Sequence, residues 1–259
     1  RALASVFNLG GVGMALGIAG AYDRAITVFS PQGRLYQVEY ALETVRAGST
    51  AMAIACDEGC VLAVEERMHT RLQNINYSWK LFQIDDHIGA VAAGLNSDAR
   101  VLVDTARIRA QILRLTYDEV PTVEAITKHI GDVMQMYTQH AGVRPFGVAL
   151  LFAGVDETGP RVFYTEPSGM VLEYDAWSIG RGSEKVREIL EVDYKRAMSL
   201  EEAVNIAIKC LVESAEKIDA NWTVRLATIP TSTRKFTLMP HEELKSILEP
   251  MIKKRLGEG

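Results

Sequence analysis

The side chains that most often carry out catalysis or hold metals are present in this sequence, but their spacing forms no common reactive pattern. Nucleophilic hydrolysis needs a serine or cysteine next to a base, and the sequence holds neither a GxSxG turn nor a Cys–His signature. The histidines are scattered without the spacing of metal ligands. They are His69, His87, His129, His140 and His241. The sequence therefore predicts no metal site, no cofactor and no general hydrolase site.

Two pairs of adjacent acidic residues, Glu65-Glu66 and Asp85-Asp86, offer carboxylates for acid–base chemistry. Adjacent residues of a β-strand point to opposite faces of the sheet, so the two carboxylates of a pair cannot meet the same substrate. We therefore interpret all four side chains as solvated charges of turns and strand edges.

A nucleotide site would need a glycine-rich loop between a strand and a helix. The N-terminal glycines are wrongly spaced for such a loop and follow no predicted strand. They are Gly11, Gly13 and Gly17. A stand-alone nucleotide-binding protein is therefore the least favoured alternative.

The composition limits the class of protein. The chain has 259 residues, of which 48% are hydrophobic, and this is enough for one large core. Its 28 Lys and Arg residues against 33 Asp and Glu give a net charge of −5, which attracts neither nucleic acid nor an anionic membrane. Cys56, Cys60 and Cys210 match neither a disulfide framework nor a zinc site. No apolar run reaches the about 20 residues that span a bilayer, so we expect a soluble, cytoplasmic protein.

Residues 1–20 differ from the rest of the chain, because they contain no acidic residue and are rich in alanine and glycine. The small residues at 19–21 resemble a signal-peptide cleavage site, but Asn8 and the glycines interrupt the apolar stretch before it. Met14 is a candidate initiator. We favour a flexible terminal arm over a secretory signal.

Hydrophobic periodicity and turn residues predict blocks of strands that alternate with helices. In chain order we expect a helix at 34–46, hairpins at 49–64 and 81–95, helices after Ser97 and Thr122, strands at 147–155, 161–165 and 170–179, helices after Ser183 and Ser199, a strand pair at 224–238 and a helix at 241–256. The spacing of Ser199 and Glu202 is that of a capping box. Paired helices between blocks of strands indicate antiparallel sheets with helices outside, in one domain. A layered αββα sandwich is compatible with this order, but the order alone does not single it out.

The segment after residue 21 resembles a known family. The sequence YDRAITVFSP at 22–31, followed by GRL at 33–35 and QVEYA at 37–41, resembles the N-terminal signature of archaeal proteasome α subunits. The similarity covers about residues 21–245. It is clearest at 48–51, 80–85, 93–95, 98–100 and 142–147.

The resemblance implies an α+β fold of the Ntn-hydrolase type, a four-layer αββα sandwich of two antiparallel sheets. It implies a flexible N-terminal gate at 1–21 and a single domain at 22–259. In this family α subunits form a heptameric ring, and two such rings cap the proteolytic β subunits of the 20S core particle. The expected function is ring assembly, gating of the path of unfolded polypeptide substrates, and docking of an ATP-dependent unfoldase or another activator.

The resemblance also implies that this subunit is not an enzyme. A β subunit is processed so that a threonine at the start of its first strand has a free amine, which acts as the base. Here the matching start is at 48–50, inside the chain, where Ser49 and Thr50 have only amide nitrogens. An active β-type hydrolase is the main alternative, and N-terminal sequencing of the purified chain would distinguish the two.

The resemblance assigns an activator-binding pocket to Lys80, Gly48 and Leu35, between neighbouring α subunits. Lys80 matches a lysine that assists catalysis in β subunits. In α subunits that lysine receives the C-terminal carboxylate of an activator tail that ends in a hydrophobic residue, tyrosine and any residue. The alternative interpretation is that Lys80 is a solvated turn lysine, because many lysines are simply exposed.

The gate is assigned to Tyr22, Asp23, Pro31 and Tyr40, which match the family's cluster that holds the gate open. A phenol, a carboxylate and a rigid turn suit a hydrogen-bonded corner. Without the resemblance, Tyr40 is interpreted as a core aromatic of a helix. The opening of the pore is assigned to three consecutive residues, His140, Ala141 and Gly142, where the family often has an aromatic residue and glycines.

Overall fold

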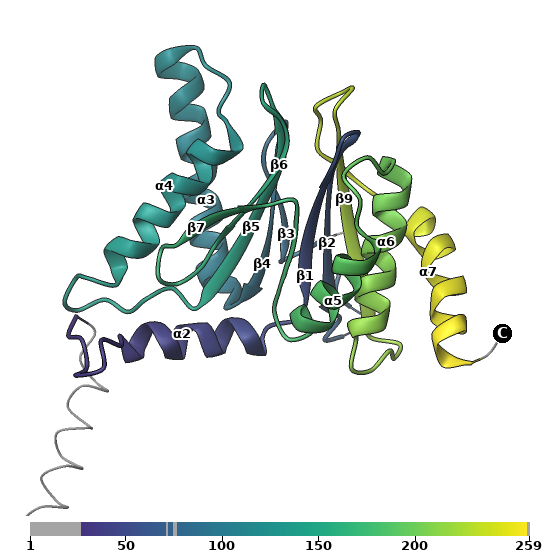
Figure 1. Ribbon diagram of the computed structural model, residues 1–259, viewed down its shortest axis with the longest axis horizontal. Coiled ribbons are helices and arrows are strands. Elements are labelled where there is room, and N and C mark those ends of the chain that lie inside the picture. Colours follow the sequence, from purple (N-terminus) through teal and green to yellow (C-terminus); the bar gives the residue numbers. More distant parts are fainter. Residues whose placement is uncertain (1–26, 71, 75–76, 258–259) are drawn as a thin grey trace, which may run out of the picture.

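Two five-stranded antiparallel sheets form the centre of the fold (Figure 1). The computed structural model describes residues 27–70, 72–74 and 77–257. The strand orders are β10-β9-β2-β1-β8 in one sheet and β3-β4-β5-β6-β7 in the other. The strands are β1 (Ala51–Cys56), β2 (Gly59–Arg67), β3 (Leu81–Asp85), β4 (Ile88–Gly94), β5 (Val148–Asp156), β6 (Gly159–Thr165), β7 (Val171–Tyr174), β8 (Ala176–Ile179), β9 (Trp222–Pro230) and β10 (Thr237–Leu238).

Helices cover the outer face of each sheet, which gives four layers (Figure 1). The sheet that contains β3 to β7 is covered by α3 (Asn96–Tyr117) and α4 (Val123–Tyr137). The other sheet is covered by α5 (Ser183–Asp193), α6 (Leu200–Ser214) and α7 (His241–Leu256). The expected αββα sandwich is therefore confirmed.

One further helix, α2 (Tyr36–Ala47), lies across one end of the sandwich (Figure 1). It buries Val38, Ala41 and Val45, which recur at the spacing of a single helical face. That face packs against β4 and β5. Helix α2 thus covers the end of the sandwich at which β1 begins.

The core has three apolar layers, one between the two sheets and one under the helices on each side. The layer between the sheets includes Ala53, Ala93 and Ala153, whereas Ile54 and Phe152 point to the helix-covered faces. Strands β1 and β5 are buried on both faces along their whole length. This explains why their sequences are apolar without alternation.

Most of the expected helix boundaries are confirmed. Helix α2 lies within two residues of the expected 34–46, and Thr122 caps α4 by accepting a hydrogen bond from the backbone of Ala125. The capping box of α6 is formed in both directions. Ser199 Oγ accepts from Glu202 N at 3.1 Å, and the Glu202 carboxylate accepts from Ser199 N at 2.8 Å.

Two expectations about elements are wrong. The single strand expected at 170–179 is divided at Asp175 into β7 and β8, which belong to different sheets. An apolar pattern does not show where a chain changes its strand partner. Ser97 does not cap α3, because the helix begins at Asn96 and its first turn has no side-chain cap.

The three cysteines are buried free thiols. Along the described segments, no helix is both long and apolar enough to cross a membrane.

Candidate functional site

Lys80 and Ser49 meet where the two sheets approach each other beside α2. Ser49 lies two residues before β1, and Lys80 lies one residue before β3 in the other sheet. The Lys80 Nζ donates a hydrogen bond to Ser49 Oγ at 2.6 Å, and Ser49 Oγ donates to the carbonyl of Glu65 at 2.8 Å. Lys80 is only 6% exposed. The interpretation of Lys80 as a solvated turn lysine is therefore wrong.

Two carboxylates of β2 near this pair are buried. Glu65 and Glu66 at the end of β2 are 4% and 1% exposed, so the expectation that they are solvated is wrong. Strand β2 lies inside its sheet and is covered on both faces, so adjacent side chains are buried in opposite directions. Asp85 is also buried and pairs with Arg114 at 2.8 Å. Asp86, in the turn, is exposed as expected.

Glu66 is held by three groups. Its Oε1 accepts hydrogen bonds from the Ser78 hydroxyl and from the backbone of Trp79, and its Oε2 lies 3.8 Å from Arg225 Nε. Burial raises the pKa of Glu66, although these partners act in the opposite direction. For Lys80 burial has the opposite effect and lowers the pKa, because it disfavours the charged ammonium. The carboxylates of Glu66 and Glu65 only partly offset this lowering.

Gly48 joins α2 to the strand region, and it is packed too tightly for any side chain. A Cβ atom on Gly48 would lie 2.5 Å from the backbone nitrogen of Gly94. The carbonyl of Gly48 accepts a hydrogen bond from Arg181 N at 2.8 Å. A Cβ atom on Gly180 would lie 2.6 Å from the carbonyl oxygen of Ser49. The chain just before and at Ser49 is therefore fixed between two backbone segments.

Leu35 lies at the other end of α2 from Gly48. The helix has 12 residues, so the two ends are separated by about 18 Å at the usual rise per residue. The structure therefore brings Gly48 close to the Ser49–Lys80 pair, but it does not bring Leu35 of the same chain there.

The gate assignment is only partly within the described residues, because Tyr22 and Asp23 lie outside them. Pro31 is exposed in a turn closed by hydrogen bonds from Gly33 N to the Ser30 carbonyl at 2.8 Å and from Ser30 N to the Arg34 carbonyl at 2.9 Å. The turn is linked to α2 because Arg34 Nε donates to a Glu39 oxygen at 2.6 Å.

Tyr40 is 49% exposed on α2, so the interpretation of Tyr40 as a core aromatic is wrong. His140, Ala141 and Gly142 form an exposed loop after α4. His140 Nδ1 lies 2.8 Å from the carbonyl of Met136, and Gly142 has a φ of +86°, a conformation that glycine adopts without strain. Both assignments, to the gate and to the pore opening, stay predictions.

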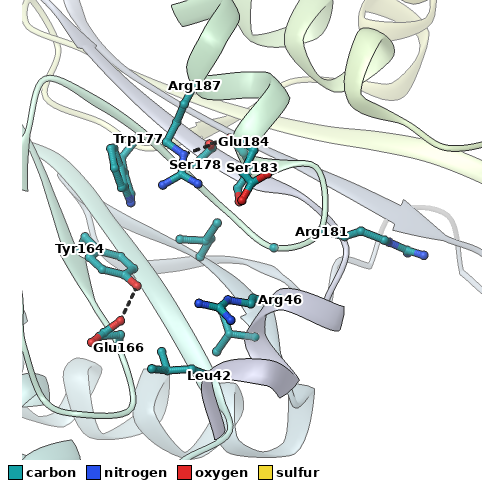
Figure 2. Close-up of a pocket in the computed structure, with 13 residues that line it drawn as sticks. Leu42, Arg46, Tyr164, Glu166, Trp177, Ser178, Arg181, Ser183, Glu184 and Arg187 are labelled. Carbon is teal, nitrogen blue, oxygen red and sulfur yellow. Dashed lines mark hydrogen bonds between the residues drawn. The ribbon is translucent and has the colours of Figure 1, made fainter. Parts of the chain in front are cut away.

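Sequence reasoning missed a cavity of about 400 Å³ beside the end of α2 (Figure 2). Arg187 of α5 lies over the ring of Trp177, 4.7 Å from its centroid, and the Tyr164 hydroxyl donates to Glu166 at 2.8 Å. Arg46 lines the cavity from α2. These residues come from separate elements, so no local motif in the sequence marks the cavity.

Two protein-family models match most of the described part of the chain, up to residue 229. The model of the proteasome subunit family matches residues 45–229. The model of the N-terminal signature of A-type proteasome subunits matches residues 22–43, which include the turn at Pro31 and most of α2.

Individual relatives agree with these family matches. The proteasome alpha subunit of Methanocaldococcus jannaschii is 51% identical over 229 residues, which cover 88% of this chain and 87% of that protein. The proteasome alpha subunit of Methanosarcina thermophila is 49% identical over 234 residues, which cover 90% and 94%. That of Methanosarcina mazei is 48% identical over 237 residues, which cover 91% and 95%. The chain therefore belongs to the proteasome subunit family and is of its α type.

Proposed function

We propose that this chain is a non-catalytic subunit of the α ring of a cytoplasmic 20S proteasome core. It would assemble with other α subunits into a heptameric ring and with proteolytic β subunits below that ring. The names of its relatives and the α-type signature support this proposal. The observation that carries the non-catalytic part is the packing of the chain in front of Ser49.

An N-terminal nucleophile needs its own free amine as the base. The nitrogen of Ser49 is part of the peptide bond to Gly48, and Gly48 is fixed against Gly94 and Arg181. Thr50 is 1% exposed, and its hydroxyl accepts a hydrogen bond from Gly182 N at 3.1 Å. Neither Ser49 nor Thr50 therefore has the free backbone amine that processing creates in a β subunit.

Lys80 is proposed to receive the C-terminal carboxylate of an activator. Its ammonium has three donor hydrogens, and the described partner Ser49 uses one of them. A charged hydrogen bond to a carboxylate in such a shielded place contributes about 1.5–3 kcal/mol, against about 0–1 kcal/mol for an exposed ion pair. Because Leu35 lies at the far end of α2, a pocket that uses Leu35, Gly48 and Lys80 takes Leu35 from the neighbouring subunit.

The remaining parts of the proposal concern the passage of substrates. Unfolded polypeptides would pass through the ring, with residues 1–21 as the gate and with Tyr22, Asp23, Pro31 and Tyr40 holding the open state. His140, Ala141 and Gly142 would line the pore opening. Their support is the family signature together with the exposure of Pro31, Tyr40 and the 140–142 loop.

The test is assembly and activity of the purified full chain. Electron microscopy should show rings, and a fluorogenic peptide should stay intact until β subunits are added. Uniform monomers would refute the ring proposal. Peptide hydrolysis that persists after complete removal of β subunits would refute the non-catalytic role and favour the β-type hydrolase alternative, which N-terminal sequencing would then examine.

A further inference from the structure

Ser49 has the hydrogen-bond partner that an activated serine needs. Its Oγ lies 2.6 Å from the Nζ of Lys80, within the range in which a base removes a proton from a nucleophile. In the structure Lys80 donates this bond, and the Ser49 hydroxyl donates to the carbonyl of Glu65 at 2.8 Å. Proton transfer to Lys80 therefore requires a neutral amine and a turn of the hydroxyl hydrogen from Glu65 to Nζ. Ser49 is half-buried, whereas Thr50 is fully buried. Of these two residues, Ser49 is therefore the more accessible to a small reagent.

The surroundings of Lys80 favour its neutral form more than water does. The charged groups that face it are Glu65 and Glu66 of β2, which stabilise the ammonium, and Arg181 of the loop before α5, which opposes it. Burial outweighs the two carboxylates, so the pKa of Lys80 is lowered from the ordinary value of a lysine. A neutral lysine amine beside a serine is the base of known Ser–Lys nucleophilic pairs.

Three neighbouring backbone donors that could face the oxyanion of peptide cleavage already have partners within the described residues. In the loop before α5, Arg181 N donates to the carbonyl of Gly48, Gly182 N donates to Thr50 Oγ1, and Ser183 N donates to the carbonyl of Gly180. Stabilisation of the oxyanion is often the largest contribution to acyl transfer. A nucleophile without it reacts with strongly activated reagents but does not turn over amides.

We propose that Ser49 is a latent nucleophile, with Lys80 as its base, that is modified once by small activated electrophiles such as phosphonofluoridates. In this step the Ser49 oxygen forms a bond to phosphorus, the P–F bond breaks, and fluoride leaves with the electron pair. The hydroxyl proton passes to the neutral amine of Lys80, which becomes an ammonium. This inference is independent of the proposed docking function, because it needs no activator and no β subunit.

The test treats the full folded chain with an alkyl phosphonofluoridate and locates the adducts by peptide mass mapping. Ser214 is the internal comparison, because it is also half-buried but its hydroxyl donates only to the carbonyl of Leu211, at 3.4 Å. Ser49 should react about 10²-fold faster than Ser214, the lower end of what a positioned general base contributes. The rate should rise with pH, with a midpoint below the ordinary pKa of lysine. Equal rates at the two serines would overturn the proposal.

The variant Lys80→Arg separates the role of Lys80 as a base from its role as a hydrogen-bond donor in the structure. Lys80→Arg keeps a positive charge and a donor for Ser49, but a guanidinium does not become neutral in the pH range of the experiment. Modification of Ser49 should fall to the rate of Ser214 in this variant. Urea-unfolded wild-type chain is the second control, and it should show the same loss of selectivity. Fast modification of Ser49 in Lys80→Arg, or in the unfolded chain, would contradict the assignment of Lys80 as the base.

Discussion

Asp98 of α3 and Arg144 of the loop after α4 form a two-pronged ion pair. Arg144 Nη1 lies 2.7 Å from Asp98 Oδ2, and Arg144 Nη2 lies 2.9 Å from Asp98 Oδ1. Asp98 Oδ2 also accepts from Gly147 N at 2.9 Å. The carboxylate thus fixes the end of the loop that carries His140 and Gly142 to the first turn of α3.

Removal of this carboxylate should destabilise the chain. Asp98 is 7% exposed and the Arg144 side chain is 58% exposed, so the buried charged hydrogen bond is the one from Gly147 N, and such a bond contributes about 1.5–3 kcal/mol. Asp98→Ala should therefore lower the free energy of unfolding by about that amount, measured by urea denaturation. The matched control on the same helix is Asp104→Ala, which removes an exposed pair with Arg107 and should cost about 0–1 kcal/mol. Equal losses in the two variants would contradict the role of Asp98.

The same pair should make stability depend on pH. Burial acts to raise the pKa of Asp98, but the hydrogen bonds from Arg144 and Gly147 outweigh it and lower the pKa below the ordinary 3.8. A carboxyl with a lowered pKa stabilises the fold above 3.8, and this contribution is lost as the pH falls from 3.8 through the folded pKa. The difference in unfolding free energy between wild type and Asp98→Asn should shrink over that window. A difference that stays constant down to the folded pKa would rule the linkage out.

The close approach of Gly48 to Gly94 predicts the effect of a single methyl group. In Gly48→Ala the new Cβ would meet backbone 2.5 Å away, and such overpacking costs about 1–3 kcal/mol. Gly33→Ala is the comparison, because no atom lies within 4 Å of its Cβ position and only the φ of +75° is unfavourable. Thermal unfolding should show a larger loss for Gly48→Ala. An unchanged melting temperature in that variant would show that the junction relaxes freely.

Local patterns predicted the individual helices and strands of this fold better than its buried charges, whereas the four layers followed from the family resemblance. Local patterns predicted helix α2, the caps at Thr122 and Ser199, and the first hairpin. Each of these patterns lies within a single element or hairpin. Glu65 and Glu66 look like edge charges in isolation. Their burial depends on coverage of both faces of β2 by segments distant in sequence, and no local pattern contains that information.

The candidate site shows the same division. Lys80 and Gly48 were found through the family resemblance, but the contact between Lys80 and Ser49 joins residues 31 positions apart and needs the two sheets to be packed. Leu35 was grouped with them, although a 12-residue helix separates it from Gly48. One chain therefore supplies Gly48 and Lys80 to the proposed activator-binding pocket, and a second copy would supply Leu35.

Deletion of residues 1–21 tests the proposed gate in a core reconstituted with β subunits. Cleavage of a fluorogenic peptide should rise, because the deletion removes the proposed barrier to diffusion. The rate at which a covalent inhibitor modifies the β sites of opened, detergent-treated cores should not change. Equal peptide cleavage before and after deletion, in a core shown to be gated, would contradict the assignment.

The most direct test uses Lys80→Ala in a reconstituted core and a synthetic peptide that ends in a hydrophobic residue, tyrosine and any residue. Each free peptide binds singly, so its binding to the variant should lose the full contribution of the charged hydrogen bond, about 1.5–3 kcal/mol. The peptide should stimulate wild type and the control Ser49→Ala, which keeps the ammonium, and an amidated peptide should stimulate neither. Lys80→Ala should form rings with normal basal peptide hydrolysis but show no stimulation. Stimulation of Lys80→Ala to the wild-type level would contradict the proposal that Lys80 receives the activator tail.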